Sequence, residues 1–243
     1  MEQGEGDPMD RFLGDQRLLV IAPHADDETI GCGGLMAKMK AVGGEVFVQV
    51  LTVGDLDHYD GRDGHTAAYT RSDELAAAMD VIGVDDWEIL IEDSDWHLRL
   101  DGMPRRDLIN LFERESRLAM DKIKPTMIAI PAPSYNQDHE MVYKAAITAC
   151  RPHLATLKPF QRMVLIADSP QLAWNIEAFH PNFYVDITDH LNTKLEAFAK
   201  HESQQRPSPH NGGIETLRLL AEMRGREISV PAAEAYECMR FVV

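Results

Sequence analysis

The sequence predicts an α/β protein in which helices cover both faces of a mostly parallel β-sheet, a three-layer αβα arrangement. Segments of strand and helix character alternate along most of the 243 residues. The strand segments are continuously apolar, which is typical of strands that are buried on both faces. No linker rich in proline, glycine or serine and no change in composition divides the chain, so we expect one domain that spans residues 1–243.

The first half of the chain contains three predicted strands and two predicted helices. Residues 17–23, RLLVIAP, are an apolar run that ends at a proline, and residues 45–54, EVFVQVLTVG, are rich in β-branched side chains. Between them, residues 33–44 have helical periodicity and end at a glycine. Residues 70–84 are rich in good helix formers, and residues 87–91, WEILI, form the next strand.

The second half continues the alternation, with three more strands and three more helices. The amphipathic pattern RRDLINLFERESRLAMDKIK predicts one long helix over residues 105–124 that stops before a proline. The apolar stretch TMIAIPAP predicts a strand over residues 126–133, and DHEMVYKAAITACR predicts a helix over residues 138–151. The remaining predictions are strands over residues 162–168 and 182–188 and a helix over residues 189–205.

Charge and composition exclude several classes of protein. With 24 Lys and Arg against 40 Asp and Glu, the formal net charge is −16, which argues against nucleic acid and anionic membrane surfaces as partners. No apolar run reaches the roughly 20 residues of a membrane span. Residues 1–16 lack the features of a signal peptide, and we expect them to form an irregular lead-in. Three scattered cysteines, Cys32, Cys150 and Cys238, predict free thiols in a cytoplasmic protein.

Polar clusters follow four consecutive predicted strands. Residues 24–28 follow the first strand, GDLDHYDGRDGH (54–65) the second, EDSDW (92–96) the third and SYNQDH (134–139) the fourth. In open α/β sheets, ligands bind at the carboxyl ends of the strands. We therefore expect the four clusters to meet on one rim of the sheet and to form the functional site there.

The densest of these clusters lies in the stretch VIAPHADDETIGCGG, residues 20–34. The side chains of Asp26, Asp27 and Glu28 repel each other, so packing alone does not account for them. The glycines that follow are compatible with a phosphate-binding turn between a strand and a helix. However, the stretch has neither the G-x-G-x-x-G pattern nor a P-loop lysine, and its carboxylates would repel a pyrophosphate. A metal-free nucleotide or sugar-phosphate site is therefore the weaker interpretation.

A metal ion accounts for the cluster better, because a cation offsets the repulsion between the carboxylates. Catalytic zinc sites use three nitrogen and carboxylate ligands and keep one position open for water. His24 and Asp27 are candidates for two ligands from one turn, and His139 in the fourth cluster is a candidate for the third. A further carboxylate is then available to accept a proton from the water. Other divalent metals also bind nitrogen and oxygen ligands, so Zn²⁺ is the first candidate among several.

These motifs resemble those of a known family. PHADDETIGCGG, residues 23–34, resembles the P-H-P-D-D-E signature of the PIG-L/LmbE-type zinc-dependent N-deacetylases, and NQDHEMVYKAA, residues 136–146, resembles their second motif. The stretches LTVGD, KLEAFAKHESQ and AEAYECMRF agree with the same family, so the resemblance runs over essentially the whole chain. It implies a Rossmann-like fold and hydrolysis of an N-acetyl group from an N-acetylglucosamine-type substrate.

The resemblance also implies roles for individual residues at the metal site. By motif position, His24, Asp27 and His139 would bind zinc. Asp26 would be the general base and later the acid that protonates the leaving amine. The cation would polarise the acetyl carbonyl and stabilise the oxyanion that forms from it.

Four further residues receive roles from the same resemblance. Glu28 and Asp138 would orient the metal ligands through hydrogen bonds. Arg71 and Asp93 match places at which family members hold sugar hydroxyls. A small-molecule amino sugar is thus the expected partner of this surface.

The sequence departs from the family pattern at a position that bears on catalysis. Many members carry a histidine at the position of Asn136, where it helps to stabilise the oxyanion. An asparagine cannot carry a positive charge, although its amide group can donate a hydrogen bond. Tyr135, His201 and His210 are the other candidates for this task.

Three alternatives stay open. The first keeps the metal but acts on a thiol conjugate or another non-sugar N-acyl compound. The second is the metal-free binding protein described above, and the third is a protein that keeps the fold but has lost turnover through the change at Asn136. A homo-oligomer is compatible with the sequence, which does not indicate a number of subunits.

Overall fold

The computed structural model describes residues 8–57, 64–171 and 177–243. Seven strands form the main sheet: β1 (Arg17–Ala22), β2 (Glu45–Thr52), β5 (Asp86–Ile91), β6 (Met127–Pro131), β7 (Met163–Ala167), β8 (Phe183–Asp186) and β9 (Ala233–Phe241). Their order across the sheet is β5-β2-β1-β6-β7-β9-β8. Pairing is parallel from β5 to β7, whereas β9 runs antiparallel to both β7 and β8. The predicted α/β fold with a mostly parallel sheet is confirmed.

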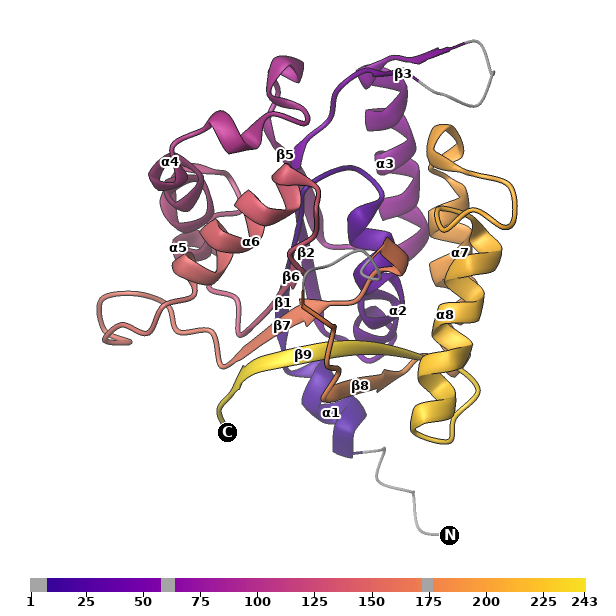
Figure 1. Ribbon diagram of the computed structural model, residues 1–243. Helices are drawn as coiled ribbons and strands as arrows, with labels where there is room; N and C mark the ends of the chain where they lie inside the picture. The colour runs from indigo at the N-terminus through magenta and orange to yellow at the C-terminus, as the bar shows by residue number, and fades with distance from the viewer. Residues whose placement is uncertain (1–7, 58–63, 172–176) are drawn as a thin grey trace, which may run out of the picture.

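Helices cover both faces of this sheet (Figure 1). One face carries α2 (Asp27–Ala41), α3 (Ala68–Ile82), α7 (Leu191–Ala199) and α8 (Ile214–Glu227). The other face carries α4 (Arg105–Asn110), α5 (Met120–Ile123) and α6 (Gln137–Ala149). The short helix α1 (Pro8–Gly14) precedes β1, and β3 (Leu56–Asp57) pairs with β4 (His65–Thr66) in a separate two-stranded ribbon.

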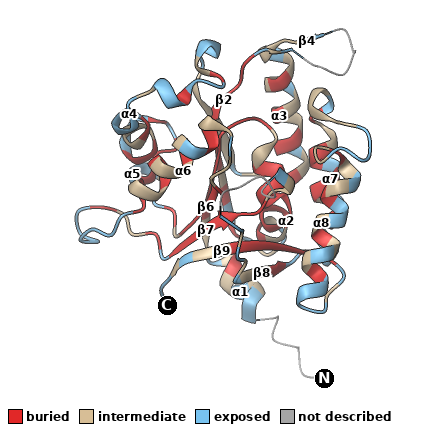
Figure 2. Cartoon of the chain, in the orientation of Figure 1, coloured by how far each residue is buried: buried red, intermediate tan, exposed pale blue. Residues whose placement is uncertain are grey.

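Each face of the sheet has its own hydrophobic core. Leu18 and Val20 of β1 belong to the core beneath α2 and α7, and Leu19 and Ile21 belong to the core beneath α4 and α6. Figure 2 shows the central strands almost entirely in the buried class. A strand that is buried on both sides has no polar face, which explains the continuous apolar runs in the sequence.

Helix α2 begins earlier than the sequence indicates. The prediction was residues 33–44, but the helix starts at Asp27, so the glycines of the opening motif lie inside it. A Cβ atom at Gly34 would lie 2.7 Å from side-chain carbons of Ile187, and one at Gly31 would lie 2.9 Å from Cβ of Ala167. These glycines therefore allow α2 to approach its neighbours closely, and they do not form a separate turn before the helix.

The predicted helix over residues 105–124 is wrong as a single element. The segment consists of α4, a π-helical turn (Leu111–Glu115) and, after a break, α5. Within the π-helical turn, Glu113 is 4% exposed and accepts hydrogen bonds from Arg151 at 2.5 Å and from Lys158 at 2.7 Å. Both partners come much later in the chain, so helical periodicity alone does not reveal this interruption.

The ends of the chain differ most from the prediction. Part of the expected irregular lead-in forms α1, because Leu13 is buried and the ring of Phe12 packs edge-on against Phe241 with 5.8 Å between centroids. The helix predicted over residues 189–205 ends at Ala199 and is followed by a 3₁₀ turn. Helix α8 and strand β9 were not predicted.

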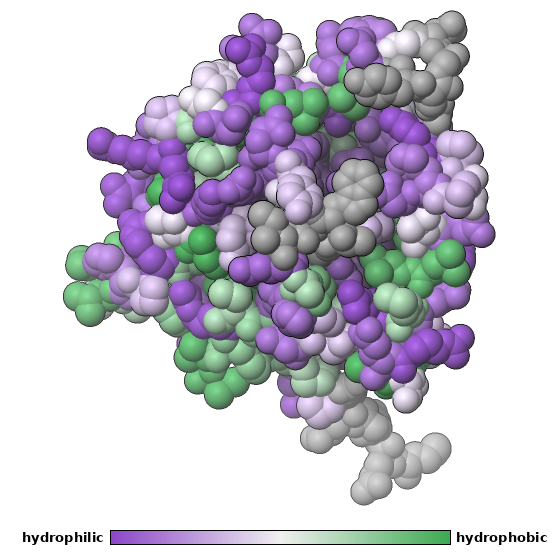
Figure 3. Space-filling model, viewed as in Figure 1, coloured by the Kyte–Doolittle hydropathy of each residue, from purple (hydrophilic) through white to green (hydrophobic). Residues whose placement is uncertain are grey.

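The surface is mainly hydrophilic on the face shown in Figure 3. Hydrophobic side chains gather at the left edge of this view, over the loop that follows α6, where Leu154 and Leu157 are exposed. Among the described helices, none has the length and apolar character needed to cross a membrane.

Candidate metal centre

Three side chains from three elements converge at the carboxyl end of the sheet. His24 follows β1, Asp27 is the first residue of α2, and His139 lies in the first turn of α6. One nitrogen or oxygen atom of each lies within 4.8 Å of the other two. Oδ2 of Asp27 is 3.4 Å from Nδ1 of His24 and 3.2 Å from Nε2 of His139. The structure thus brings together the three residues that the sequence predicts as ligands.

The donor set of this group fits a divalent cation. Two imidazole nitrogens and one carboxylate oxygen are the ligands of many catalytic zinc sites that leave a position open. Asp27 lies between the two histidines. Burial alone would raise the pKa of its carboxyl group, but the adjacent His139 and His24 have the larger effect and lower this pKa, so Asp27 is ionised. The group could therefore hold a metal ion, with His24, Asp27 and His139 as its ligands.

Asp138 orients the first of these histidines. Its Oδ2 lies 2.9 Å from Nε2 of His24. The backbone N–H groups of Leu98 and Leu100 also donate to this carboxylate, at 2.8 and 2.9 Å, so its position is fixed from two sides. A histidine that donates from Nε2 presents Nδ1 as the metal-binding atom, and here Nδ1 faces Asp27. Burial alone would lower the pKa of His24, but its hydrogen bonds to Asp138 and Asp27 raise it to about 9.

Asp26 lies beside the ligands in an unusual backbone conformation. Its φ angle is 125°, and its N–H donates to Oε2 of Glu28 at 2.9 Å. Backbone strain of this kind is concentrated at functional sites. Burial and the negative charge of Asp27 raise the pKa of Asp26 to about 7, whereas the pKa of Asp27 is lowered. Two neighbouring carboxyl groups with opposite pKa shifts are suited to different chemical tasks.

Glu28 connects this turn to the segment that follows helix α7. Its Oε1 lies 3.0 Å from Nε2 of His201 and accepts a hydrogen bond from Thr29 at 2.8 Å. Both Glu28 and His201 are fully buried. Burial alone would lower the pKa of His201, but the charge of Glu28 raises it. In this arrangement His201 lies behind Glu28 and is covered from solvent.

The other candidates for oxyanion stabilisation lie in different surroundings. Asn136 is the N-cap of α6, where its Oδ1 accepts a hydrogen bond from the N–H of Asp138 at 2.9 Å. Its amide nitrogen is therefore the group available to donate. Tyr135 is 65% exposed, and His210 lies in the loop before α8, where it accepts a hydrogen bond from the N–H of Gly212.

Arg71 and His97 form a buried pair beside His24. Arg71 is 2% exposed and lies 2.9 Å from the carbonyl oxygen of Gly54 and 3.0 Å from Nε2 of His97. The ring of His97 packs edge-on against that of His24, with 4.8 Å between centroids. Burial, together with the charges of His24 and Arg71, lowers the pKa of His97 to about 3. His97 had no predicted role, although it directly follows the third polar cluster of the rim.

The rest of the expected rim is only partly described. Asp93 is exposed and caps a 3₁₀ turn (Ser94–Trp96) by accepting a hydrogen bond from the N–H of Asp95 at 3.0 Å. In the second cluster, residues 58–63 lie outside the described part of the chain. The predicted contacts of Arg71 and Asp93 with sugar hydroxyls stay predictions.

A small cavity adjoins two of the proposed ligands. Asp27 and His139 line it together with Ser134, which follows β6, and with Asp168 and Ser169, which follow β7. Nε of Arg224 donates to Oδ2 of Asp168 at 2.8 Å, and burial raises the pKa of this carboxyl group. Asp168 was not predicted as a site residue, although it ends a predicted strand whose carboxyl end lies on the same rim as the four polar clusters.

Several known proteins are similar to this chain in sequence. Residues 19–150 match the family described as GlcNAc-PI de-N-acetylase, PIG-L. Diacetylchitobiose deacetylase of Thermococcus kodakarensis is 29% identical over 198 residues, which cover 78% of this chain and 70% of the relative. A 1D-myo-inositol 2-acetamido-2-deoxy-alpha-D-glucopyranoside deacetylase of Kribbella flavida is 38% identical over 86 residues, which cover 32% of this chain and 28% of that protein.

Solved structures share the fold across nearly the whole chain. The N,N'-diacetylchitobiose deacetylase of Pyrococcus horikoshii superposes with a TM-score of 0.67 at 24% identity, covering 96% of this chain and 87% of that one. The 4-carboxy-2-hydroxymuconate hydratase GalB of Pseudomonas putida superposes with a TM-score of 0.63 at 18% identity, covering 94% and 98%. Because one fold serves both a deacetylase and a hydratase, the function has to be argued from the site.

Proposed function

The chain belongs to the PIG-L family, and from this premise we propose that it is a hydrolase that removes an N-acetyl group from an N-acetylglucosamine-type substrate with the help of a divalent cation. The convergence of His24, Asp27 and His139 beside Asp26 is the observation that supports this proposal most. Zinc is the first candidate for the cation, because two histidines and one carboxylate are a common catalytic zinc set. Other divalent metals accept the same ligands.

We propose Asp26 as the general base of the reaction. Its pKa of about 7 lies near the neutral pH at which a base is most effective. When bound, a cation would make a water molecule more acidic and would polarise the acetyl carbonyl. Asp26 accepts one proton of the attacking water and returns it to the leaving nitrogen, so the products are acetate and a free amine.

The neighbouring residues orient these groups and contact the substrate. Glu28 fixes the backbone of Asp26. We propose the amide nitrogen of Asn136 as the hydrogen-bond donor to the developing oxyanion, because the oxygen of that side chain already caps α6. Asp93 and Arg71 are the proposed contacts for sugar hydroxyls. Asp93 is exposed. Arg71 already bonds Gly54 and His97, so only its remaining guanidinium N–H groups are available to the substrate.

The substrate class rests on the named relatives. Two of them act on N-acetylglucosamine units, one in a chitin disaccharide and one on an inositol glycoside, as their names state. We therefore propose an acetamido sugar as the substrate and do not specify the group to which the sugar is attached. A non-sugar N-acyl compound, including a thiol conjugate, is the alternative that keeps the same chemistry.

The test is release of acetate from a panel of compounds by purified protein. The panel contains N-acetylglucosamine, diacetylchitobiose and an N-acetylglucosaminyl inositol, with an N-acetyl amino acid and an N-acetyl thiol conjugate as non-sugar compounds. Each is measured with added zinc, without zinc and with a chelator. Asp26→Asn serves as the catalytic control, because it removes the base and keeps the side chain's size.

Chelator-sensitive release from the acetamido sugars, lost in Asp26→Asn, supports the proposal. Release from the non-sugar compounds alone would move the substrate class while keeping the metal chemistry. Release that is insensitive to the chelator would contradict the role of a cation. Absence of release from every compound, with zinc still bound, would contradict the proposed deacetylation.

A further inference from the structure

The middle of helix α2 is bonded to a buried glutamate from another element. Glu234, near the start of β9, is 4% exposed, and its carboxylate oxygens accept hydrogen bonds from the backbone N–H groups of Gly34 and Leu35, each at 2.7 Å. In a regular α-helix, these two N–H groups would donate to the carbonyl oxygens of Ile30 and Gly31, four residues earlier. A side chain of the sheet thus takes part in two consecutive steps of the helical hydrogen-bond ladder.

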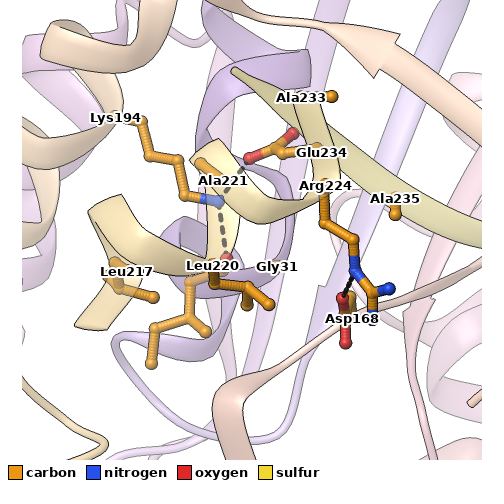
Figure 4. A pocket seen from close by; sticks show the side chains of 11 residues that line it. Gly31, Asp168, Lys194, Leu217, Leu220, Ala221, Arg224, Ala233, Glu234 and Ala235 are labelled. Atoms are coloured by element: carbon orange, nitrogen blue, oxygen red, sulfur yellow. Dashed lines mark hydrogen bonds and ion pairs between the residues drawn. The ribbon is translucent and has the colours of Figure 1, made fainter. Parts of the chain in front are cut away.

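The two carbonyl groups of these steps also have side-chain partners. Nζ of Lys194, in α7, lies 2.8 Å from the carbonyl oxygen of Ile30 and 2.6 Å from Oε1 of Glu234. The hydroxyl of Tyr236, in β9, lies 3.2 Å from the carbonyl oxygen of Gly31 and 2.8 Å from Oε2 of Glu234. Figure 4 shows Lys194 directed at Glu234. We call Lys194, Glu234 and Tyr236 the Lys194 cluster.

Stability alone is a weak explanation for this cluster. Lys194 and Glu234 are each 4% exposed and Tyr236 is fully buried, so both charges have been removed from water. The cost of that desolvation offsets much of the attraction, and apolar residues of similar size are often as stable. Buried, fully hydrogen-bonded polar groups instead define one arrangement of the elements that they connect.

The cluster acts on the part of α2 next to the metal centre. Asp27 and Glu28 begin the helix, and the bonded backbone groups belong to residues 30–35, just after them. Glycine permits this close approach: a Cβ atom at Gly33 would lie 3.0 Å from Cγ of Lys194. The glycines of the opening motif, which the proposed chemistry does not use, are thus accounted for by the contact between α2 and its partners.

We infer that Lys194, Glu234 and Tyr236 are positioning residues for the metal centre. They connect residues 30–35 of α2 to α7 and β9, and so hold the first turn of α2, with Asp27, where it meets His24 of the β1 end and His139 of α6. Asp27 is the one proposed ligand on α2, and a shift of that turn would separate it from both histidines. The inference rests on the proposed metal site but not on the identity of the substrate.

The test compares two buried lysines. Lys194→Met removes the ammonium group that bonds Ile30 and Glu234. Lys158→Met is the matched control. Lys158 is also buried, at 9% exposure, and its Nζ likewise contacts a glutamate, Glu113 at 2.7 Å, and a backbone carbonyl. It differs from Lys194 in lying on the other face of the sheet. Zinc affinity is measured by competition titration of the metal-stripped proteins, and the midpoint of urea unfolding is measured for both.

We expect Lys194→Met to bind zinc about tenfold more weakly than the parent, a size of effect typical of removing a group that supports a metal ligand. Lys158→Met should bind zinc within about twofold of the parent. Equal weakening in the two variants, or unchanged affinity in a folded Lys194→Met, would overturn the inference. Because zinc alone is the probe, failure of the deacetylase proposal would leave this result intact.

A smaller change covers the case in which Lys194→Met fails to fold. Tyr236→Phe removes one hydroxyl from the cluster and keeps the aromatic ring in the core. We expect zinc binding several-fold weaker with little change in the unfolding midpoint. A Tyr236→Phe protein that binds zinc as the parent does would contradict a positioning role for that hydroxyl.

Discussion

The carboxylate of Asp138 lies 2.9 Å from Nε2 of His24, although the two residues are 114 positions apart in the chain. Asp138 directly precedes the proposed ligand His139, so the start of α6 contributes both a ligand and the group that orients another ligand. The same carboxylate accepts hydrogen bonds from Leu98 and Leu100 and so ties a third segment to the site. A change at Asp138 therefore tests the metal centre without removing a ligand.

We expect Asp138→Asn to weaken zinc binding about 10–100-fold, the usual effect of losing a hydrogen-bond partner of a metal-bound histidine. Oδ2 of Asp138 accepts from both His24 and Leu98, and an amide nitrogen in its place would face two donors. Zinc affinity is measured by competition with a chelator. Glu140→Gln, an exposed change in the same turn of α6, is the control and should bind as the parent does.

His139→Ala tests the third ligand directly. Loss of one of three protein ligands should weaken zinc binding by more than the change at Asp138, because a coordinate bond is lost and not only its orientation. Zinc content after dialysis against a weak chelator, together with the titrated affinity, measures this. A variant that holds zinc as tightly as the parent would place the third ligand elsewhere.

Asp26→Asn should keep zinc and lose turnover. Removal of a general base lowers kcat by about 10²–10⁴-fold. Asparagine is among the residues that best tolerate a positive φ, so the backbone at φ 125° should be preserved better than with alanine. The measurement is kcat for acetate release together with zinc content. Near-normal turnover in the zinc-loaded variant would remove Asp26 from its proposed role.

Asn136→His tests the position at which the chain departs from the family pattern. A histidine can carry a positive charge and donate to the oxyanion, so we expect kcat to rise. The change also removes the N-cap that bonds Asp138, at a cost of about 1 kcal/mol in the free energy of unfolding. Asn136→Ala, which loses both cap and donor, is the control. If Asn136→Ala turned over as fast as the parent, the position would not stabilise the oxyanion.

Gly54→Ala should destabilise the protein by crowding the buried pair beside His24. A Cβ atom at Gly54 would lie 2.3 Å from Cβ of His97, which has no room to withdraw because Thr52 and Arg71 hold its ring. Overpacking of this kind costs about 1–3 kcal/mol in the free energy of unfolding. Gly102→Ala is the control, because a Cβ atom there would lie 3.9 Å from a ring carbon of Trp96, an ordinary contact distance. Urea unfolding of both variants measures the difference.

Much of the fold follows from local pattern, but helix α8 and strand β9 do not. The buried central strands were predicted because both of their faces are apolar. Helix α8 was missed because only Leu217, Ala221 and Gly225 of its 14 residues are buried, which leaves a narrow apolar stripe among many charges. Strand β9 was missed because its second half is only partly buried and mixes polar with apolar residues, so it has no uniform pattern.

The sequence by itself determined the residue types of the site: a histidine and carboxylates after the first strand, a histidine at the start of a later helix, and the rim on which they meet. The family resemblance also implied that Glu28 and Asp138 orient the ligands, but only the tertiary structure decided which partners these and other supporting residues bond. Glu28 meets His201 across 173 positions, and Gly34 meets Glu234 across 200. Periodicity reports the environment of neighbouring residues, whereas a hydrogen bond near 3 Å requires the coordinates of both partners.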